Sequence, residues 1–125
     1  MVTTPQEVAL ADVRRAINMF SKVNVPVLGL VENMAGFTLP DGSTLDIFGE
    51  GGGEKLAESL GVPVLGQIPI VEKVRAQSDN GKPIAIDTES EMGKAFKELA
   101  ETVAQQVAIR NSALPPTENV EITTR

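Results

Sequence analysis

The chain has 125 residues, of which 42% are hydrophobic and 22% charged, with a formal net charge of −6, so it suits one folded domain. It contains no Cys and no His, which excludes disulfides, thiolate zinc sites, clusters held by its own cysteines and a Ser-His-Asp triad. It also lacks Trp and Tyr, and an acidic chain with four Phe is a poor candidate for binding nucleic acid.

The sequence also lacks the patterns that membrane spans and metal sites require. No apolar run approaches the roughly 20 residues that a membrane span needs, and no basic-then-apolar signal opens the chain. No pair of carboxylates stands out as an acid/base couple, and no D-x-D pattern suggests a metal site. We therefore expect a cytoplasmic protein without a membrane partner, with no catalytic residue and no metal ligand of its own.

Helical and strand patterns alternate along the chain. Leu10, Val13 and Ile17 recur at helical spacing in the first of them. The predicted helices cover residues 5–23, 54–60, 71–79 and 90–109. Continuous apolar runs, typical of strands covered on both faces of a parallel sheet, occupy residues 25–31 and 62–69, and residues 83–86 are a short extended piece. This alternation predicts an α/β fold with a parallel sheet.

Both ends of the chain differ from this pattern. Residues 1–4 look like the end of a strand with almost no strand before it, so we expect the chain to start inside a larger fold. Residues 111–125 have no periodicity and contain two adjacent prolines. We interpret them as a tail, which leaves residues 1–110 as the domain.

The glycine-rich segment 49–53 invites a test for a phosphate loop. A Walker A motif, G-x-x-x-x-G-K-[ST], needs a hydroxyl residue after its Lys, but Lys55 is preceded by Glu54 and followed by Leu56. The dinucleotide fingerprint fails as well, because Glu54 stands where its third Gly should be. The segment is either a flexible entry to a helix or a weak anion site formed by free amides.

Two strand ends carry candidate binding residues. Asn33 lies just past the predicted strand 25–31, where ligands bind in open α/β sheets, and its amide suits the edge of a purine. The alternative is a loop Asn that satisfies local backbone groups. Residues 67–70 follow the next strand and can line the same crevice, since Pro69 exposes an apolar surface.

These segments together resemble the Mrp family of MinD-like P-loop ATPases, the iron–sulfur cluster carrier type. The resemblance starts with T-T-P-Q-E-V-A-L at residues 3–10 and covers about residues 2–110 in the right order. It includes V-P-V-L-G leading into Glu32-Asn33-Met34, I-F-G followed by three glycines, L-G followed by Ile68-Pro69, and the stretch 75–83. Only the C-terminal part of such a protein is matched.

The resemblance implies a doubly wound, mostly parallel sheet, with the Walker A loop and an acidic residue that assists Mg²⁺ in upstream segments absent here. Members of the family dimerise, bind ATP and carry or help assemble iron–sulfur clusters, which implies a homodimer and an iron–sulfur client protein. The position of Asn33 faces the adenine in MinD-like ATPases, and the segment after the Ile-Pro pair closes over the base. The resemblance therefore assigns adenine contacts to Asn33, Pro69 and Ile70.

The sequence also departs from the family pattern. Many Mrp-like proteins carry a C-P-x-C pair after the Asn-Met segment, but here Leu39 and Gly42 stand in the Cys positions. Since neither residue can ligate iron, we expect no iron–sulfur cluster to bind through this chain. Val71 stands where family members often have Asp, which weakens the assignment around Ile70.

Two interpretations follow. In the first, the chain is the C-terminal part of an Mrp-like ATPase, which has the adenine side of the site but neither P-loop nor activity of its own. In the second, it is a stand-alone α/β interaction module that uses no nucleotide. An incomplete sheet exposes an edge and an apolar face. We therefore expect the chain to associate by swapping elements or pairing edges.

Overall fold

A computed structural model describes residues 1–39 and 41–115. Its strands are β1 (Val2–Thr3), β2 (Leu30–Thr38), β3 (Thr44–Leu45) and β4 (Val64–Ile70). Its helices are α1 (Glu7–Lys22), α2 (Gly52–Leu60), α3 (Glu72–Asp79), the short 3-10 helix η1 (Ile84–Ile86) and α4 (Glu91–Ala113). No helix in the described ranges is long and apolar enough to cross a membrane.

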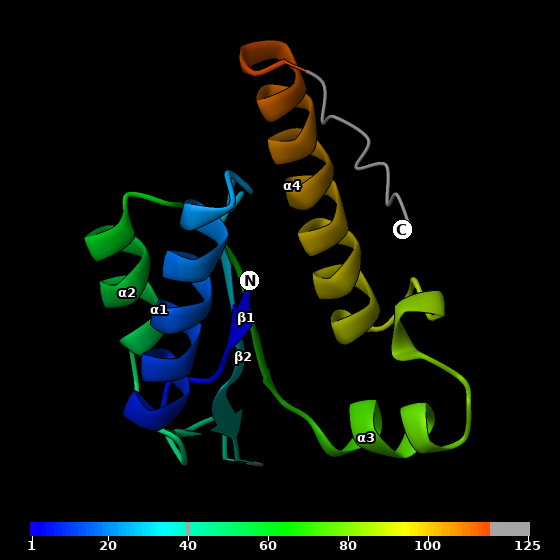
Figure 1. The fold of residues 1–125 in the computed structure, drawn as a ribbon. Coiled ribbons are helices and arrows are strands. Elements are labelled where there is room, and N and C mark those ends of the chain that lie inside the picture. The colour runs from blue at the N-terminus through cyan, green and yellow to red at the C-terminus, as the bar shows by residue number, and fades with distance from the viewer. Residues whose placement is uncertain (40, 116–125) are drawn as a thin grey trace, which may run out of the picture.

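The sheet is mostly parallel, as predicted. Strand β2 pairs in parallel with β1 and β4, and β3 joins the far end of β2 as an antiparallel hairpin. Helices α1 and α2 lie together on one side of the sheet and α4 lies on the other (Figure 1). The α/β class with helices on both faces is therefore confirmed.

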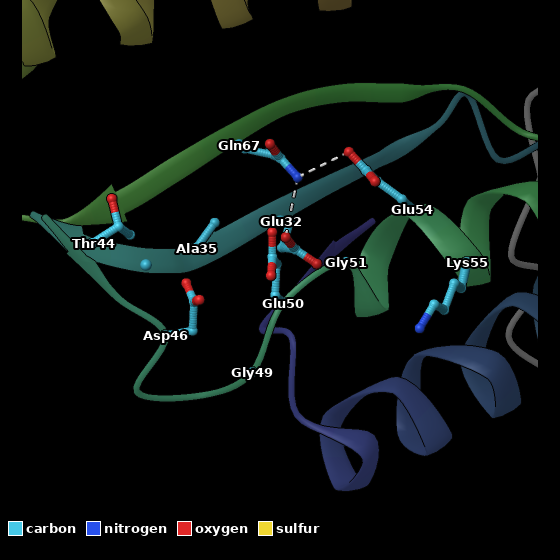
Figure 2. Close-up of a pocket in the computed structure, with 11 residues that line it drawn as sticks. Glu32, Ala35, Thr44, Asp46, Gly49, Glu50, Gly51, Glu54, Lys55 and Gln67 are labelled. Atoms are coloured by element: carbon cyan, nitrogen blue, oxygen red, sulfur yellow. Dashed lines mark hydrogen bonds between the residues drawn. The ribbon is translucent and has the colours of Figure 1, made fainter.

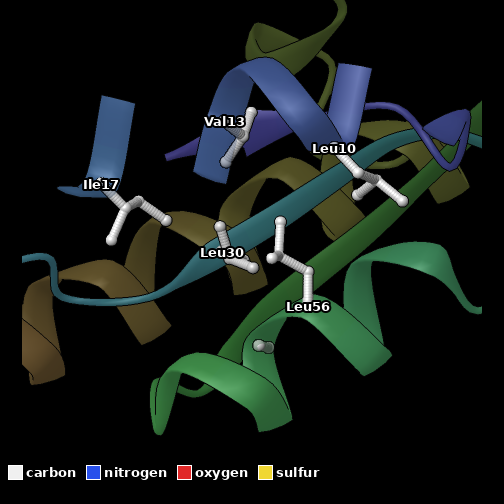
Figure 3. Packing of buried hydrophobic residues seen from close by; sticks show 6 residues of the cluster. Leu10, Val13, Ile17, Leu30 and Leu56 are labelled. Carbon is white, nitrogen blue, oxygen red and sulfur yellow. The ribbon is translucent and has the colours of Figure 1, made fainter. Parts of the chain in front are cut away.

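Each face of the sheet has its own core. On the first face, apolar residues of α1 and α2 pack against Leu30 of β2 (Figure 3). Leu30 and Leu56 are the largest side chains that are fully buried in the described part of the chain. On the second face, Ile68 of β4 packs with Ile84 and with Met92 of α4. Burial on both faces explains why these strands are rich in apolar residues.

The second strand was predicted wrongly. The apolar run 25–31 predicts a strand there, but β2 begins at Leu30 and continues through polar residues to Thr38. Its start is set by its neighbours, because Leu30 pairs with Val64 and Val31 pairs with Val2. The consequence for the site is that Asn33 lies within a strand and not in a loop beyond one.

Two smaller predictions also need correction. Residues 83–86 were expected to be extended, but residues 84–86 form the 3-10 helix η1, closed by the hydrogen bond from the Asp87 amide to the Ile84 carbonyl. Helix α4 runs to Ala113, so residues 111–113 of the predicted tail are helical. Residues 114 and 115 follow the helix, residues 116–125 lie outside the described residues, and the division at residue 110 stays a prediction.

Candidate functional site

The three residues that the sequence assigned to the adenine lie close together. Asn33 of β2 pairs with Ile68 of β4, and Phe37 of β2 pairs with Ile70, so Asn33 lies beside the segment that carries Pro69 and Ile70. Asn33, Pro69 and Ile70 are all half-buried. These residues lie toward the carboxyl ends of two neighbouring parallel strands, which is where open α/β sheets bind ligands.

An irregularity in the sheet separates Asn33 from Phe37. Between these two pairs β2 contains residues 34–36, whereas β4 contains only Pro69. Met34 has a φ of 59° and Gly36 a φ of 79°, and both values lie in the left-handed region. The extra residues form a β-bulge, and a Met in this conformation is strained, because its Cβ crowds the backbone.

A buried carboxylate occupies the other face of β2. Glu32 is 2% exposed, and its Oε2 accepts a hydrogen bond of 2.6 Å from the backbone amide of Gly53, near the N-terminus of α2. Its Oε1 accepts a bond of 3.2 Å from Nε2 of Gln67, and the same Nε2 lies 3.4 Å from Oε1 of Glu54. Figure 2 shows Gln67 between the two carboxylates. Glu32 thus joins β2, β4 and α2.

The end of the glycine-rich segment, Gly52 and Gly53, is buried and closely packed, whereas Gly49 has open space around it. The Gly53 amide, which an anion would need, already donates to the Glu32 carboxylate. A Cβ on Gly53 would lie 2.6 Å from Glu32 Oε2, and one on Gly52 would overlap the Pro5 carbonyl. Gly52 and Gly53 therefore allow α2 to start against β2 and the start of α1, and the Gly53 amide is not free to bind a phosphate.

A pocket of about 460 Å³ opens beside Glu32. Its lining comes from the carboxyl half of β2, the hairpin and the start of α2 (Figure 2). The residues are Glu32, Ala35, Gly36, Thr44, Asp46, Gly49, Glu50, Gly51, Glu54, Lys55 and Gln67. Carboxylates outnumber the single Lys, so the pocket repels phosphate groups. None of the three predicted adenine residues lines it.

Sequence reasoning named residues 67–70 as lining a crevice but missed the buried Glu32 and its hydrogen bond from Gln67. A signal was available, because Glu32 lies between Val31 and Asn33 at a position whose alternation with Leu30 predicts an inward side chain. A buried carboxylate requires hydrogen-bond donors, and the amides at a helix N-terminus are suitable donors.

Leu39 and Gly42, which the resemblance places at the Cys positions, take part in hydrogen bonds with each other and with Ser43. The Leu39 amide donates to the Ser43 carbonyl at 2.8 Å, and the Gly42 amide donates to the Leu39 carbonyl at 2.9 Å. The Ser43 hydroxyl and amide both donate to Asp41 Oδ1, which lowers the pKa of the Asp41 carboxyl. Among the residues that the structure describes, no group of three or more His, Cys, Asp or Glu side chains could hold a metal ion.

The fold matches solved P-loop NTPases of the MinD type. The chain superposes on the MinD cell division protein of Aquifex aeolicus with a TM-score of 0.64 at 19% identity, covering 83% of this chain and 42% of that one. It also superposes on a nucleotide-binding protein from Archaeoglobus fulgidus, solved in complex with ADP, with a TM-score of 0.54 at 40% identity. That match covers 63% of this chain and 33% of the other.

Sequence comparison narrows the class to a family. The family described as ParA: NUBPL iron-transfer P-loop NTPase matches residues 1–104, and the chain belongs to this family. The chain is 51% identical over 108 residues to the iron-sulfur cluster carrier protein of Pyrococcus abyssi, covering 86% of this chain and 37% of that protein. It is 44% identical over 114 residues to the iron-sulfur cluster transfer protein NUBPL of Dictyostelium discoideum, covering 90% of this chain and 35% of that protein.

These matches confirm the resemblance to the Mrp and MinD group. The chain spans about a third of the length of the curated relatives that it matches. They support the first of the two interpretations, and no match supports a stand-alone interaction module.

Proposed function

We propose that this chain supplies the adenine side of an ATP site in an iron–sulfur cluster carrier of the cytoplasm. The observation that carries the proposal is the position of Asn33 directly beside the Ile68–Ile70 segment, where two parallel strands approach their carboxyl ends. A side-chain amide offers one donor and one acceptor to the edge of a purine. Pro69 and Ile70 offer apolar surface to its face, and a related structure binds ADP.

The remaining parts of an ATP site are not among the 125 residues. The sequence has no G-x-x-x-x-G-K-[ST] motif, and the acidic pocket beside Glu32 does not suit a phosphate chain. In our proposal the phosphates and Mg²⁺ are held by other segments of a protein of the relatives' length. Because the chain has no Cys, any cluster that such a protein carries for a client is ligated outside these residues.

Titration with adenosine, monitored by NMR, tests the adenine contacts without involving the phosphates. We expect the side-chain amide of Asn33 and the methyl groups of Ile70 to shift, with saturation only at millimolar adenosine. Replacing Asn33 by Ala should remove the hydrogen bonds to the base edge and weaken adenosine binding about fivefold to tenfold.

Asn111→Ala is the matched control, because Asn111 is an exposed Asn on α4, far along the chain from the strands. It should leave the adenosine titration unchanged. If the unsubstituted chain shows no shift at Asn33, or if Asn33→Ala binds adenosine as well as the unsubstituted chain, the adenine site lies elsewhere.

We also propose that the chain forms a homodimer or an edge-paired oligomer. In the described sheet β1 pairs only with β2, so its second edge has no neighbour, and Val2 is 63% exposed. Edges and apolar surface of this kind favour association. Light scattering of the isolated chain at micromolar concentrations should give a mass above that of one chain. A monomer over the whole concentration range would contradict this expectation.

A further inference from the structure

Left-handed backbone at Met34 interrupts the regular part of strand β2. Glu32 and Gly36 both face the pocket on the α2 side: Glu32 lines it, and a Cβ on Gly36 would lie beside Thr44 and Asp46, which line it too. Val31 packs in the core on the α4 side, which places Asn33 on that face and Glu32 on the α2 face. The residue with left-handed backbone, Met34, lies between the two regular stretches.

Residues 34–36 also lack regular strand partners. The last pair between β1 and β2 is Thr3 with Glu32, and the pairs with β3 begin at Phe37. On the side of β4 only Pro69 lies opposite these residues, and a proline has no amide hydrogen to donate. In the described sheet, the backbone of residues 34–36 therefore has fewer strand partners than the regular parts of β2.

A strained residue persists only where its surroundings require it. Gly36 is held against the hairpin, since a Cβ at Gly36 would lie 2.9 Å from the Thr44 methyl group. Glu32 is fixed by its bonds to Gly53 and Gln67. With β2 fixed on both sides, the extra residues of the bulge have to be accommodated between these anchors, and the strain falls on Met34.

We infer that Met34 is a positioning residue: its left-handed backbone accommodates the extra residues of the bulge, so that Asn33 stays paired with Ile68 beside Pro69 while Gly36 stays against the hairpin. The effect of Met34 on binding of a purine base rests on the proposed function. The effect of Met34 on the shape of the bulge does not. What matters is the backbone conformation of Met34, so residues that adopt a positive φ easily can replace it and β-branched residues cannot.

A series of substitutions at Met34 tests this inference in the whole chain. Met34→Gly and Met34→Asn accept a positive φ, whereas Met34→Val disfavours it. Met19→Val is the control, because Met19 is an exposed Met in the regular helix α1. Two readouts are measured for each variant. The first is the nuclear Overhauser effect between the Gly36 α-hydrogens and the Thr44 methyl group, and the second is the dissociation constant of adenosine.

We expect the Gly, Asn and control variants to keep the Gly36–Thr44 contact and to bind adenosine within about twofold of the unsubstituted chain. Met34→Val should lose the contact and bind adenosine about tenfold more weakly. Loss of both signals in Met34→Gly would show that the Met side chain is needed and would overturn the inference, as would a Val variant that keeps both. If Met34→Val does not fold, the inference is judged on Met34→Gly and Met34→Asn alone: it stands if both variants keep the two signals and fails if both lose them.

The two readouts keep the inference separate from the proposed function. If adenosine shifts no resonance in the unsubstituted chain, the proposed adenine site fails, and the Gly36–Thr44 contact still decides whether Met34 positions the bulge. If adenosine binds normally to every variant, the adenine site stands and the role of Met34 is refuted.

Discussion

Replacing Glu32 by Leu should lower the free energy of unfolding by about 2–4 kcal/mol. The leucine side chain has a similar size but cannot accept the hydrogen bonds from the Gly53 amide and from Gln67 that the carboxylate now accepts. An unpaired buried amide costs about 1–3 kcal/mol, and the favourable position of a carboxylate near the start of α2 is lost as well. Urea denaturation of the chain measures the change.

Glu32→Gln separates the hydrogen bonds from the charge. A Gln at this position can still accept from the Gly53 amide, but its NH₂ group then faces Nε2 of Gln67. We expect a loss of about 1 kcal/mol, smaller than that of the leucine variant. Glu58→Gln is the control, because Glu58 is exposed on the same helix α2. Buried charges can sometimes be replaced by apolar groups without loss of stability. A Glu32→Leu variant as stable as the original chain would place Glu32 among these cases and contradict the prediction.

The helices were predicted well because their signals are local. The predicted helix 5–23 corresponds to α1, and the predicted helices 54–60 and 71–79 correspond to α2 and α3 within a few residues. Each depends on apolar residues that recur along its own length. The strand 62–69 likewise corresponds to β4, because its apolar run coincides with the segment that pairs with β2.

Strand β2 shows what local patterns cannot give. Its start depends on pairing with β1 and β4, and its bulge depends on the hairpin partner Thr44 and on Pro69, all distant in the sequence. The left-handed backbone at Met34 has no sequence signal, since Met does not favour that conformation. The adenine assignment of Asn33 rests on its amide at a predicted strand end and on the family resemblance, and its role stays a prediction although Asn33 pairs with Ile68, next to Pro69.

ATP should bind the isolated chain more weakly than about millimolar, and the rate of ATP hydrolysis should not rise above background. Most of the affinity of a P-loop protein comes from phosphate contacts, namely the loop amides, the loop Lys and Mg²⁺ held by a hydroxyl. The sequence contains no Walker A motif, and in the glycine-rich segment the Gly53 amide is already bonded to Glu32. Glu50 and Glu54 beside that segment would repel a triphosphate further.

What remains for ATP is the side-chain amide of Asn33 and the apolar surface of Pro69 and Ile70. Hydrogen bonds of this kind contribute about 1–3 kcal/mol and the apolar contacts add to that gain, but an association cost of at least about 4 kcal/mol cancels much of the sum and leaves at best millimolar affinity. Because the chain has a net charge of −6 and no Walker A motif to hold phosphates, adenosine should bind at least as well as ATP, the reverse of the order seen when a P-loop is present. Calorimetry with adenosine and with ATP tests this order of affinities, and micromolar affinity for ATP would mean that these residues build a phosphate site that we have not recognised.

In a protein of the relatives' length that includes a Walker A loop, Asn33→Ala should weaken ATP binding about tenfold and leave the fold intact. Unchanged affinity for ATP in that variant would remove Asn33 from the site.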